Sequence, residues 1–528
     1  MNARTRHPLR WTLALGGVGL TSLAASADPG DWPMWGRDHT RNMVAPEATG
    51  LPSDFAAGEF VGLTDEIDMA TTRNIKWIAK LGSQSYGNPT VANGRVFVGT
   101  NNDTPRDERY TGDRSCVYAL DEETGELVWQ LNIPKLGTGK VSDWEFLGIC
   151  SSPAVEGDRV YVLTNRCEVM CLDFNGLADG NDGPFTDEAA YFTDRGQEPQ
   201  ELAATDADIL WKLDMIEECG VFPHNITSSS ILIAGDLLWV STSNGVDYGH
   251  VETPAPFAPC LITVNKNTGE LVAEEASGLS ERIFHGNWTS PAYLATEEQE
   301  LCIFGGPDGR VYAFSPEPSE SEDGWPILTE AWRYDANPPE YRVRDGRELK
   351  YATREGPSEV MGTPVTVGNR VYASIGQDPE HGEGIGNLVC LDATKRGDIT
   401  NVEGAVIWSY NKIKRSLSTV AVHDGLLFAA DFSGFVYCLD AETGEEHWVH
   451  DTMAHIWGSP LVADGKVYIG NEDGYLTILP ASAERTDDDV IEIDMQSPIY
   501  SSPIAANGVL YVASHTHLFA IADSTEGR

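Results

Sequence analysis

One stretch near the C-terminal end of the chain carries the pattern of apolar and polar positions that the rest of the chain repeats. Residues 436–439 (Val-Tyr-Cys-Leu) are apolar, as in a strand that is buried on both faces. Asp440 ends this run, and an aspartate side chain can accept hydrogen bonds from the backbone of a following turn. Gly444 can take the positive φ that such a turn needs, and Trp448 follows it. The pattern predicts a strand, a tight turn and a second strand.

The same pattern recurs along the chain. Close copies begin at Val117 and Leu261, and both continue through Asp or Asn into Thr-Gly-Glu. Looser copies begin at Val169, Val311 and Leu388. Self-similarity at a period of about 40 residues or more indicates a repeat architecture, in which each unit packs against its neighbours.

Eight such units can be counted, each with a short first strand near a Pro or Ser, a turn, and further strands. The last unit reaches residues 518–521 and lacks a fourth strand, whereas a spare strand with Trp77 at its centre lies at 74–81. Ring closure would pair the two and remove exposed sheet edges. The predicted fold is therefore all-β: an eight-bladed β-propeller of four-stranded antiparallel blades over residues 74–524. Each repeated Trp is expected to fill the gap between two blades.

The N-terminus has the features of a secretory signal. Arg4, Arg6 and Arg10 precede an apolar stretch at 11–23, which is too short to favour a membrane span, and Ala25-Ser26-Ala27 fits a cleavage site. An uncleaved anchor is the alternative. The predicted organisation is a signal peptide at 1–27, an N-terminal segment at 28–73, the propeller at 74–524 and a tail at 525–528.

Composition restricts the partners. The formal net charge of −45 in 528 residues repels phosphate backbones and anionic lipid, so nucleic-acid and membrane-surface partners are not expected. No segment after the signal is apolar enough to span a bilayer. The nine cysteines are an odd number, so at least one is unpaired. Cys171, Cys390 and Cys438 share one repeat position, which indicates small core residues.

The Val-Tyr-Ala-Leu-Asp…Thr-Gly…Trp pattern, which residues 117–129 carry, resembles the repeat of pyrroloquinoline-quinone (PQQ)-type β-propellers. That superfamily includes quinoprotein alcohol dehydrogenases and the propeller of the outer-membrane protein assembly machinery. The resemblance covers nearly all of residues 30–524 and is specific for fold rather than function, because one fold hosts many functions. Several stretches resemble more closely a group of secreted bacterial PQQ-like propellers of unassigned activity, namely residues 31–38, 176–185, 222–225, 243–247 and 283–288.

Polar and aromatic side chains precede the first strands of the units, where a propeller has the mouth of its central channel. One interpretation is a mouth that binds a small or planar ligand, with Trp288 or Trp457 as a stacking floor. The other is that these groups bond one another and water and so plug the channel. The candidate binding residues are His224, Asn225, His285, Asn287, Trp288, Lys414, Arg415 and Trp457.

Binding of a quinone cofactor would require a more specific set of side chains. The resemblance implies that PQQ would be held by cations and stacking, with Ca²⁺ as Lewis acid and a carboxylate as base. The candidates for cofactor binding are Lys414, Arg415 and Trp288. The candidates for binding the metal or acting as the base are Glu145 and Glu359. Dehydrogenases of the family carry an adjacent Cys-Cys pair at the cofactor. This chain has Cys150-Ser151-Ser152 in the comparable region and no haem relay, which counts against such an enzyme.

An acidic insertion is a separate metal candidate. Alternating carboxylate and amide oxygens between glycines suit Ca²⁺, although the spacing is not that of an EF-hand. The alternative is a solvated, turn-rich loop. The candidate ligands are Asp173, Asn175, Asp179, Asn181 and Asp182. His250 and His381 lie in other insertions, and they are weak signals.

The function predicted from these observations is that of an exported, non-catalytic binding or assembly scaffold in the periplasm or outside the cell. Its loops would recognise a protein or a small-molecule ligand, and a monomer is expected. The alternative is a PQQ- and Ca²⁺-dependent quinoprotein oxidoreductase of the alcohol or sugar dehydrogenase type. A polysaccharide- or polyphenol-binding module is a third interpretation, which rests on aromatic side chains and acidic loops.

Overall fold

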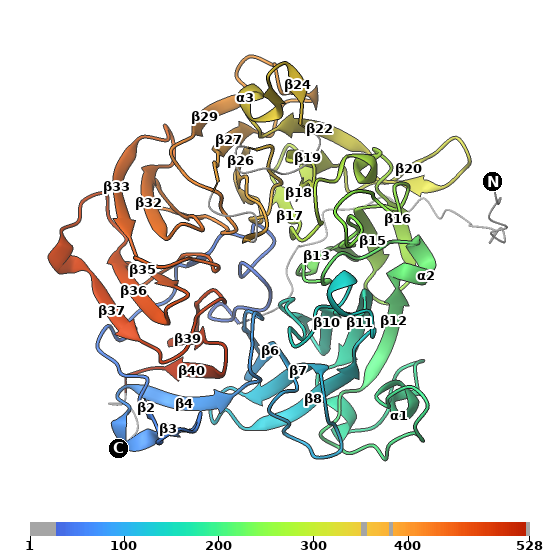
Figure 1. The fold of residues 1–528 in the computed structure, drawn as a ribbon, viewed down its shortest axis with the longest axis vertical. Helices are drawn as coiled ribbons and strands as arrows, with labels where there is room; N and C mark the ends of the chain where they lie inside the picture. Colours follow the sequence, from blue (N-terminus) through green and yellow to red (C-terminus); the bar gives the residue numbers. More distant parts are fainter. Residues whose placement is uncertain (1–27, 350–355, 380–383, 524–528) are drawn as a thin grey trace.

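The chain forms a ring of eight antiparallel sheets around a central axis (Figure 1). This computed structural model describes residues 28–349, 356–379 and 384–523. The predicted eight-bladed propeller is confirmed, and the predicted signal peptide and tail lie outside the described residues. Within the described ranges, no helix combines the length and the apolar character needed to cross a bilayer.

Each blade has four strands in sequence order from the axis outward, except the last. Blades 1 to 4 are built from β5 (Thr90–Ala92), β6 (Arg95–Asn101), β7 (Arg114–Asp121) and β8 (Leu127–Pro134); β9 (Ala154–Glu156), β10 (Arg159–Leu163), β11 (Glu168–Asp173) and β12 (Ile209–Asp214); β13 (Leu232–Ala234), β14 (Leu237–Ser241), β15 (Leu261–Asn265) and β16 (Leu271–Glu274); β17 (Ala292–Ala295), β18 (Glu300–Gly305), β19 (Arg310–Phe314) and β22 (Glu330–Asp335). Blades 5 to 8 are built from β25 (Val365–Val367), β26 (Arg370–Ser374), β27 (Leu388–Asp392) and β29 (Val406–Tyr410); β30 (Ala421–His423), β31 (Leu426–Ala430), β32 (Phe435–Asp440) and β33 (Glu446–Asp451); β34 (Leu461–Ala463), β35 (Lys466–Gly470), β36 (Tyr475–Pro480) and β37 (Ile491–Asp494); β38 (Ile504–Ala506), β39 (Val509–Ala513), β40 (His517–Ile521) and β4 (Ile75–Lys80).

Short elements extend the blades or lie outside them. Three blades gain strands at their edges: β21 and β20 in blade 3, β28 in blade 4 and β1 in blade 7. The short elements are β1 (Val44–Ala45), β20 (Ser319–Glu320), β21 (Pro326–Ile327), β28 (Gly397–Asp398), the hairpins β2 (Glu59–Phe60) with β3 (Ile67–Asp68) and β23 (Val343–Arg344) with β24 (Arg347–Glu348), and the helices α1 (Glu188–Tyr191), α2 (Met215–Cys219) and α3 (Pro339–Arg342).

The repeated turn joins neighbouring blades. Asp440 Oδ1 accepts hydrogen bonds from the backbone N–H groups of Glu442 and Thr443, at 2.9 and 2.8 Å. Gly444 has a φ of 73°, and a Cβ added there would lie 2.7 Å from the ring of Trp408 in the preceding blade. The indole N–H of Trp408 donates to the Ala441 carbonyl oxygen at 3.1 Å. The predicted filling of the gap between blades by tryptophan is confirmed here, and it explains why the turn needs a glycine.

The ring closes as predicted. Strand β4 pairs antiparallel with β40, so the N-terminal strand becomes the outermost strand of the last blade. Trp77 on β4 donates its indole N–H to the Glu122 carbonyl oxygen in the turn of blade 1, at 2.9 Å. The junction between the last blade and the first therefore uses the same kind of contact as the junction between blades 5 and 6.

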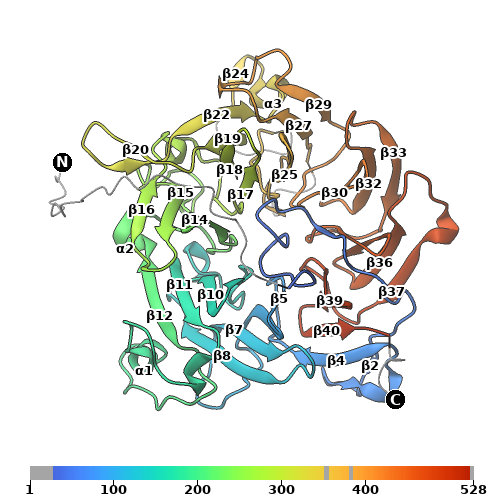
Figure 2. The same cartoon turned by 180° about the vertical axis from the view of Figure 1, so that it is seen from behind.

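The N-terminal segment before β4 also runs across the centre of the ring, as Figure 2 shows. Its Arg41 is fully buried and donates hydrogen bonds to the carbonyl oxygens of Pro291 and Ile231, both at 2.9 Å. Hydrogen bonds join residues 30–43 to a residue in or beside the innermost strand of every blade, namely Val91, Val155, Ile231, Tyr293, Thr366, Val422, Val462 and Asn507. We call residues 28–46 the N-terminal plug.

Candidate functional site

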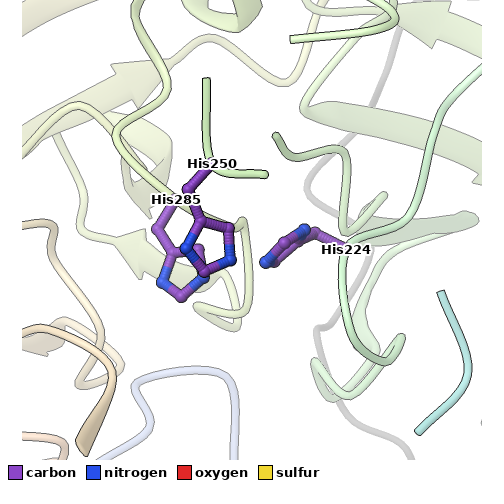
Figure 3. Close-up of side chains that lie close together, drawn as sticks. All are labelled: His224, His250 and His285. Carbon is purple, nitrogen blue, oxygen red and sulfur yellow. The ribbon is translucent and has the colours of Figure 1, made fainter. Parts of the chain in front are cut away.

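Three histidines meet on the linker face, by which we mean the face formed by the linkers before the innermost strands and by the loops between second and third strands. His224 lies in the linker before β13, His285 lies in the linker before β17, and His250 lies in the loop between β14 and β15 (Figure 3). Their ring centroids are 4.4 to 5.1 Å apart. One nitrogen from each ring lies within 4.8 Å of the other two, so this histidine trio has the donor set and spacing to hold one metal ion.

The orientation of His224 is fixed by the backbone. Its Nδ1 lies 2.7 Å from the Val246 carbonyl oxygen, which can only accept, so Nδ1 carries the proton. The side chain is 1% exposed, and its Nε2 has no hydrogen-bond partner among the described residues. Burial lowers the pKa of His224 from 6.5 to about 4, so the ring is neutral near pH 7. The lone pair on Nε2 is therefore available as a ligand.

A close approach of the chain brings the histidines together. A Cβ on Gly245 would lie 2.4 Å from the His224 Cβ and 2.9 Å from the His285 carbonyl oxygen, so only glycine fits. Val246 donates its N–H to that same carbonyl at 2.9 Å. Val246 thus bonds the His224 side chain through its C=O and the His285 backbone through its N–H. His250 follows on the same loop and is the most exposed of the three.

Trp288 and Asn287 are built into the wall of the site. The indole N–H of Trp288 is shared between the carbonyl oxygens of His224 and Ile226, at 3.3 and 3.1 Å. The Trp288 ring meets the His285 ring in an edge-on arrangement with centroids 5.2 Å apart. Asn287 donates through Nδ2 to the Cys260 carbonyl oxygen at 2.7 Å. Trp288 therefore supports the histidines, whereas Asn287 ties the linker of His285 to the residue before β15.

The other predicted binding residues do not join the histidine trio. Asn225 has a φ of 57° and uses its backbone N–H to bond the Val141 carbonyl oxygen at 3.0 Å. Lys414 is exposed, whereas Arg415 is fully buried. Trp457 stacks on Tyr500, with ring centroids 4.5 Å apart and an interplanar angle of 12°. The predicted ring of polar groups is thus divided into separate clusters.

The two predicted catalytic carboxylates differ in environment. Glu145 is exposed in the linker of blade 2. Glu359 is 1% exposed in the linker of blade 5, and neither of its carboxylate oxygens has a hydrogen-bond partner in the described ranges. Burial raises the pKa of Glu359 well above its usual value, while the charge of Arg415 acts in the opposite direction. A buried carboxylate with a raised pKa, such as that of Glu359, is typical of functional sites.

The acidic insertion lies between β11 and β12. Asn175 donates through Nδ2 to Asp179 at 2.9 Å, and burial together with neighbouring carboxylates raises the pKa of Asp173. Asp208, a fully buried neighbour, was not among the predicted ligands; its pKa is raised to about 6, chiefly by burial. In the described part of the chain, the insertion does not bring three carboxylate ligand atoms within 4.8 Å of one another. Calcium binding here remains a prediction.

The histidine trio was not predicted as a unit. His224 and His285 were predicted on the ring of candidates, whereas His250 was a weak signal in an insertion. His381, the other insertion histidine, lies outside the described residues. The only local signal for a close approach was Gly245, in the stretch Ser243-Asn244-Gly245 that follows β14.

Two comparisons place the chain among known sequences. The family model described as outer membrane protein assembly factor BamB matches residues 60–130, 113–283 and 395–488, which together make up more than half of the chain. A 1-butanol dehydrogenase (cytochrome c) from Thauera butanivorans is 30% identical over 141 residues, or 24% of this chain. That match spans only 17% of the dehydrogenase.

Solved structures agree on the fold. BamB from Moraxella catarrhalis has a TM-score of 0.51 at 14% identity, covering 86% of this chain and 98% of its own. A europium-containing methanol dehydrogenase has a TM-score of 0.57 at 12% identity, covering 94% of this chain and 98% of its own. At sequence identities this low, the two matches show a shared fold and nothing about function. On the match of the family model, the chain belongs to the family of PQQ-like β-propellers described as outer membrane protein assembly factor BamB.

Proposed function

We propose that the protein is an exported PQQ-like propeller that acts as a non-catalytic binding or assembly scaffold, with its recognition surface on the linker face. The observation that carries this proposal is the loop between β14 and β15. Tyr248, Val251 and Phe257 on this loop are 68%, 63% and 87% exposed, beside the buried histidines. Large exposed apolar and aromatic side chains gathered on one loop are typical of binding surfaces.

The residues present do not form a cradle for PQQ. Trp288 lies edge to face with His285 and is tied to two carbonyl oxygens, so it is not a free stacking floor. Lys414 and Arg415 differ in exposure, so they do not present a pair of cations to a tricarboxylate. Cys150 is a free thiol, and serines follow it at positions 151 and 152.

A quinoprotein oxidoreductase is the second candidate, because one named relative is a 1-butanol dehydrogenase and Glu359 is a buried carboxylate near Arg415. Titration of the purified mature protein with PQQ and Ca²⁺ separates the two candidates. We expect no saturable heat of binding and no shift of the quinone absorption band at tens of micromolar cofactor. Stoichiometric binding with a shifted band would favour the second candidate over the scaffold.

A crosslinking experiment tests the recognition surface directly. A photo-reactive amino acid at position 257 should give covalent adducts in the native cell envelope, because Phe257 projects from the proposed surface. The matched control is position 63, since Leu63 is as exposed but lies between β2 and β3 at the outer rim (Figure 1). Equal adduct yields from both positions would contradict a surface confined to the linker face. N-terminal sequencing of the envelope protein tests cleavage near Ala27.

A further inference from the structure

We propose that His224, His250 and His285 bind one transition-metal ion of the borderline class that includes Zn²⁺, Co²⁺, Ni²⁺ and Cu²⁺, and that this ion forms part of the recognition surface on the linker face. The second clause rests on the proposed function and deepens it. The first clause concerns the histidine trio alone, so the two can fail separately.

The donor set determines the class of ion. The trio offers three imidazole nitrogens and no carboxylate. Imidazole suits Zn²⁺, Cu²⁺ and Ni²⁺, whereas Ca²⁺ and Mg²⁺ prefer oxygen ligands. The proton on His224 Nδ1 is held by the Val246 carbonyl oxygen, which leaves Nε2 as the ligand atom. That nitrogen is buried and unpartnered within the described residues. An unpartnered buried nitrogen is costly, and a bound ion would remove the cost.

The distances are compatible with one ion after a small movement. Nitrogens that each lie 2.0–2.1 Å from a tetrahedral zinc ion are about 3.3 Å apart. The three ligand atoms here lie within 4.8 Å of one another, so closure requires a movement of the order of 1 Å. His250 can supply it, because it is the most exposed of the three and lies in the long loop between β14 and β15.

The surroundings orient the ligands before an ion arrives. A backbone carbonyl on the non-ligating nitrogen is the usual outer contact of a metal-binding histidine, and Val246 provides it for His224. The Val246 N–H bonds the backbone of His285 at 2.9 Å, so one residue positions two ligands. The Asp247 carboxylate interacts electrostatically with His224 and His250, which favours a cation. The overall charge of −45 acts in the same direction.

Three protein ligands leave one tetrahedral position for another molecule. The ion would also join two linkers of the ring to the loop that carries Tyr248, Val251 and Phe257. Metal binding should therefore hold this loop in one position and present a vacant coordination site beside exposed apolar side chains. The ligand class that fits is a molecule or protein segment with a metal-binding group, such as a carboxylate, imidazole or thiolate, next to an apolar surface.

The first experiment is a calorimetric titration of the untagged mature protein with ZnCl₂, paired with the visible spectrum after loading with Co²⁺. We expect one ion per chain and the intense absorption of tetrahedral Co²⁺. His250→Ala should weaken binding about 100-fold, because it removes one of three ligands from an exposed position without opening the core. The matched control is His447→Ala, which removes an exposed histidine on β33 and should leave the affinity unchanged.

Three outcomes separate the parts of the inference. The metal site is overturned if the wild-type protein binds no stoichiometric Zn²⁺, or if His250→Ala binds Zn²⁺ as tightly as the wild type does. Either result leaves the crosslinking test of the scaffold unaffected. Zn²⁺ that binds but leaves amide exchange in residues 247–258 and the crosslink yield at position 257 unchanged overturns the role of the ion in recognition. Both parts of the inference are supported if Zn²⁺ slows amide exchange in these residues and the crosslink yield depends on the metal.

Discussion

Two buried nitrogen-bearing side chains, one on each side of the ring, differ in whether their hydrogen-bonding groups are satisfied. In the N-terminal plug, the Arg41 guanidinium is fully buried and donates to carbonyl oxygens of Trp35, Ile231 and Pro291. On the linker face, His224 is equally well buried, but its Nε2 has no partner among the described residues. The fold thus satisfies one buried group and leaves the other unsatisfied at a cost in stability.

The difference separates structural residues from candidates for function. A buried polar group that bonds backbone from distant parts of the chain holds those parts together, and Arg41 does this for blades 3 and 4. A buried group that is oriented by one contact and left unpartnered on the other side contributes little to the fold. It is better explained by something that binds there. The predictions below test whether the two sides behave as differently as their hydrogen bonds indicate.

The largest effect is expected in the plug. Arg41→Met should lower the free energy of unfolding by about 3–5 kcal/mol, because it leaves several buried carbonyl oxygens without donors. Urea denaturation followed by tryptophan fluorescence measures this. Arg37→Met is the matched control, since Arg37 is more exposed and its side chain makes one hydrogen bond within the described residues, to the Pro29 carbonyl oxygen. Equal losses for the two variants would show that the plug does not depend on the buried guanidinium.

A smaller effect of opposite sign is expected on the linker face. Zn²⁺ at 100 times its dissociation constant should raise the free energy of unfolding by about 2.7 kcal/mol. The increment should be the same in Arg41→Met, since Arg41 belongs to the opposite side and distant sites act additively. At the same Zn²⁺ concentration it should fall to about 0.4 kcal/mol in His250→Ala, which is expected to bind the ion about 100-fold more weakly. An increment that shrinks in the Arg41 variant would mean that the two sides are coupled through the ring.

The sequence predicted the fold because its determinants are local and repeated. Asp440, Gly444 and Trp448 lie within nine residues, and the same spacing recurs in other blades. Ring closure by β4 followed from a count of strands, because a blade short of one strand has an unpaired edge. The prediction needed no knowledge of how individual loops run.

The plug and the histidine trio could not be predicted in this way. Arg41 meets carbonyl oxygens 190 and 250 residues away, and nothing near Arg41 in the sequence marks those partners. His224 and His285 were placed correctly on the linkers because linkers have fixed positions in a propeller. His250 was not, because the path of an insertion is set by contacts such as those of Gly245 and Val246. Which residues of an insertion make such contacts cannot be inferred from its composition.

Gly245 allows the linker face to be altered without removal of a histidine. Gly245→Ala should weaken Zn²⁺ binding about 10-fold or more, because the added Cβ would lie 2.4 Å from His224 and must displace it. Gly249→Ala is a control in the same loop, since its Cβ would meet nothing closer than 3.5 Å. Calorimetry on both variants provides the comparison. If the two alanines weakened binding equally, the effect would come from loop flexibility rather than from the position of His224.

The smallest effect is the contribution of one linker-face histidine to the pH dependence of stability. His515 packs against Tyr500 there, and burial lowers its pKa from 6.5 to about 4. Because the folded state binds this proton less readily than the unfolded state, stability is retained above pH 6.5 and falls as the pH drops toward 4. His515→Gln should reduce that fall by about 1 kcal/mol at pH 5, and His447→Gln should not. Urea denaturation from pH 7 to 4.5 measures both variants.

Arg41 stays protonated throughout this pH range, because its lowered pKa is still about 9. An acid transition that His515→Gln leaves unchanged would therefore point to the other histidines whose pKa values are lowered by burial: His224 and His517, both to about 4, and His39 and His450.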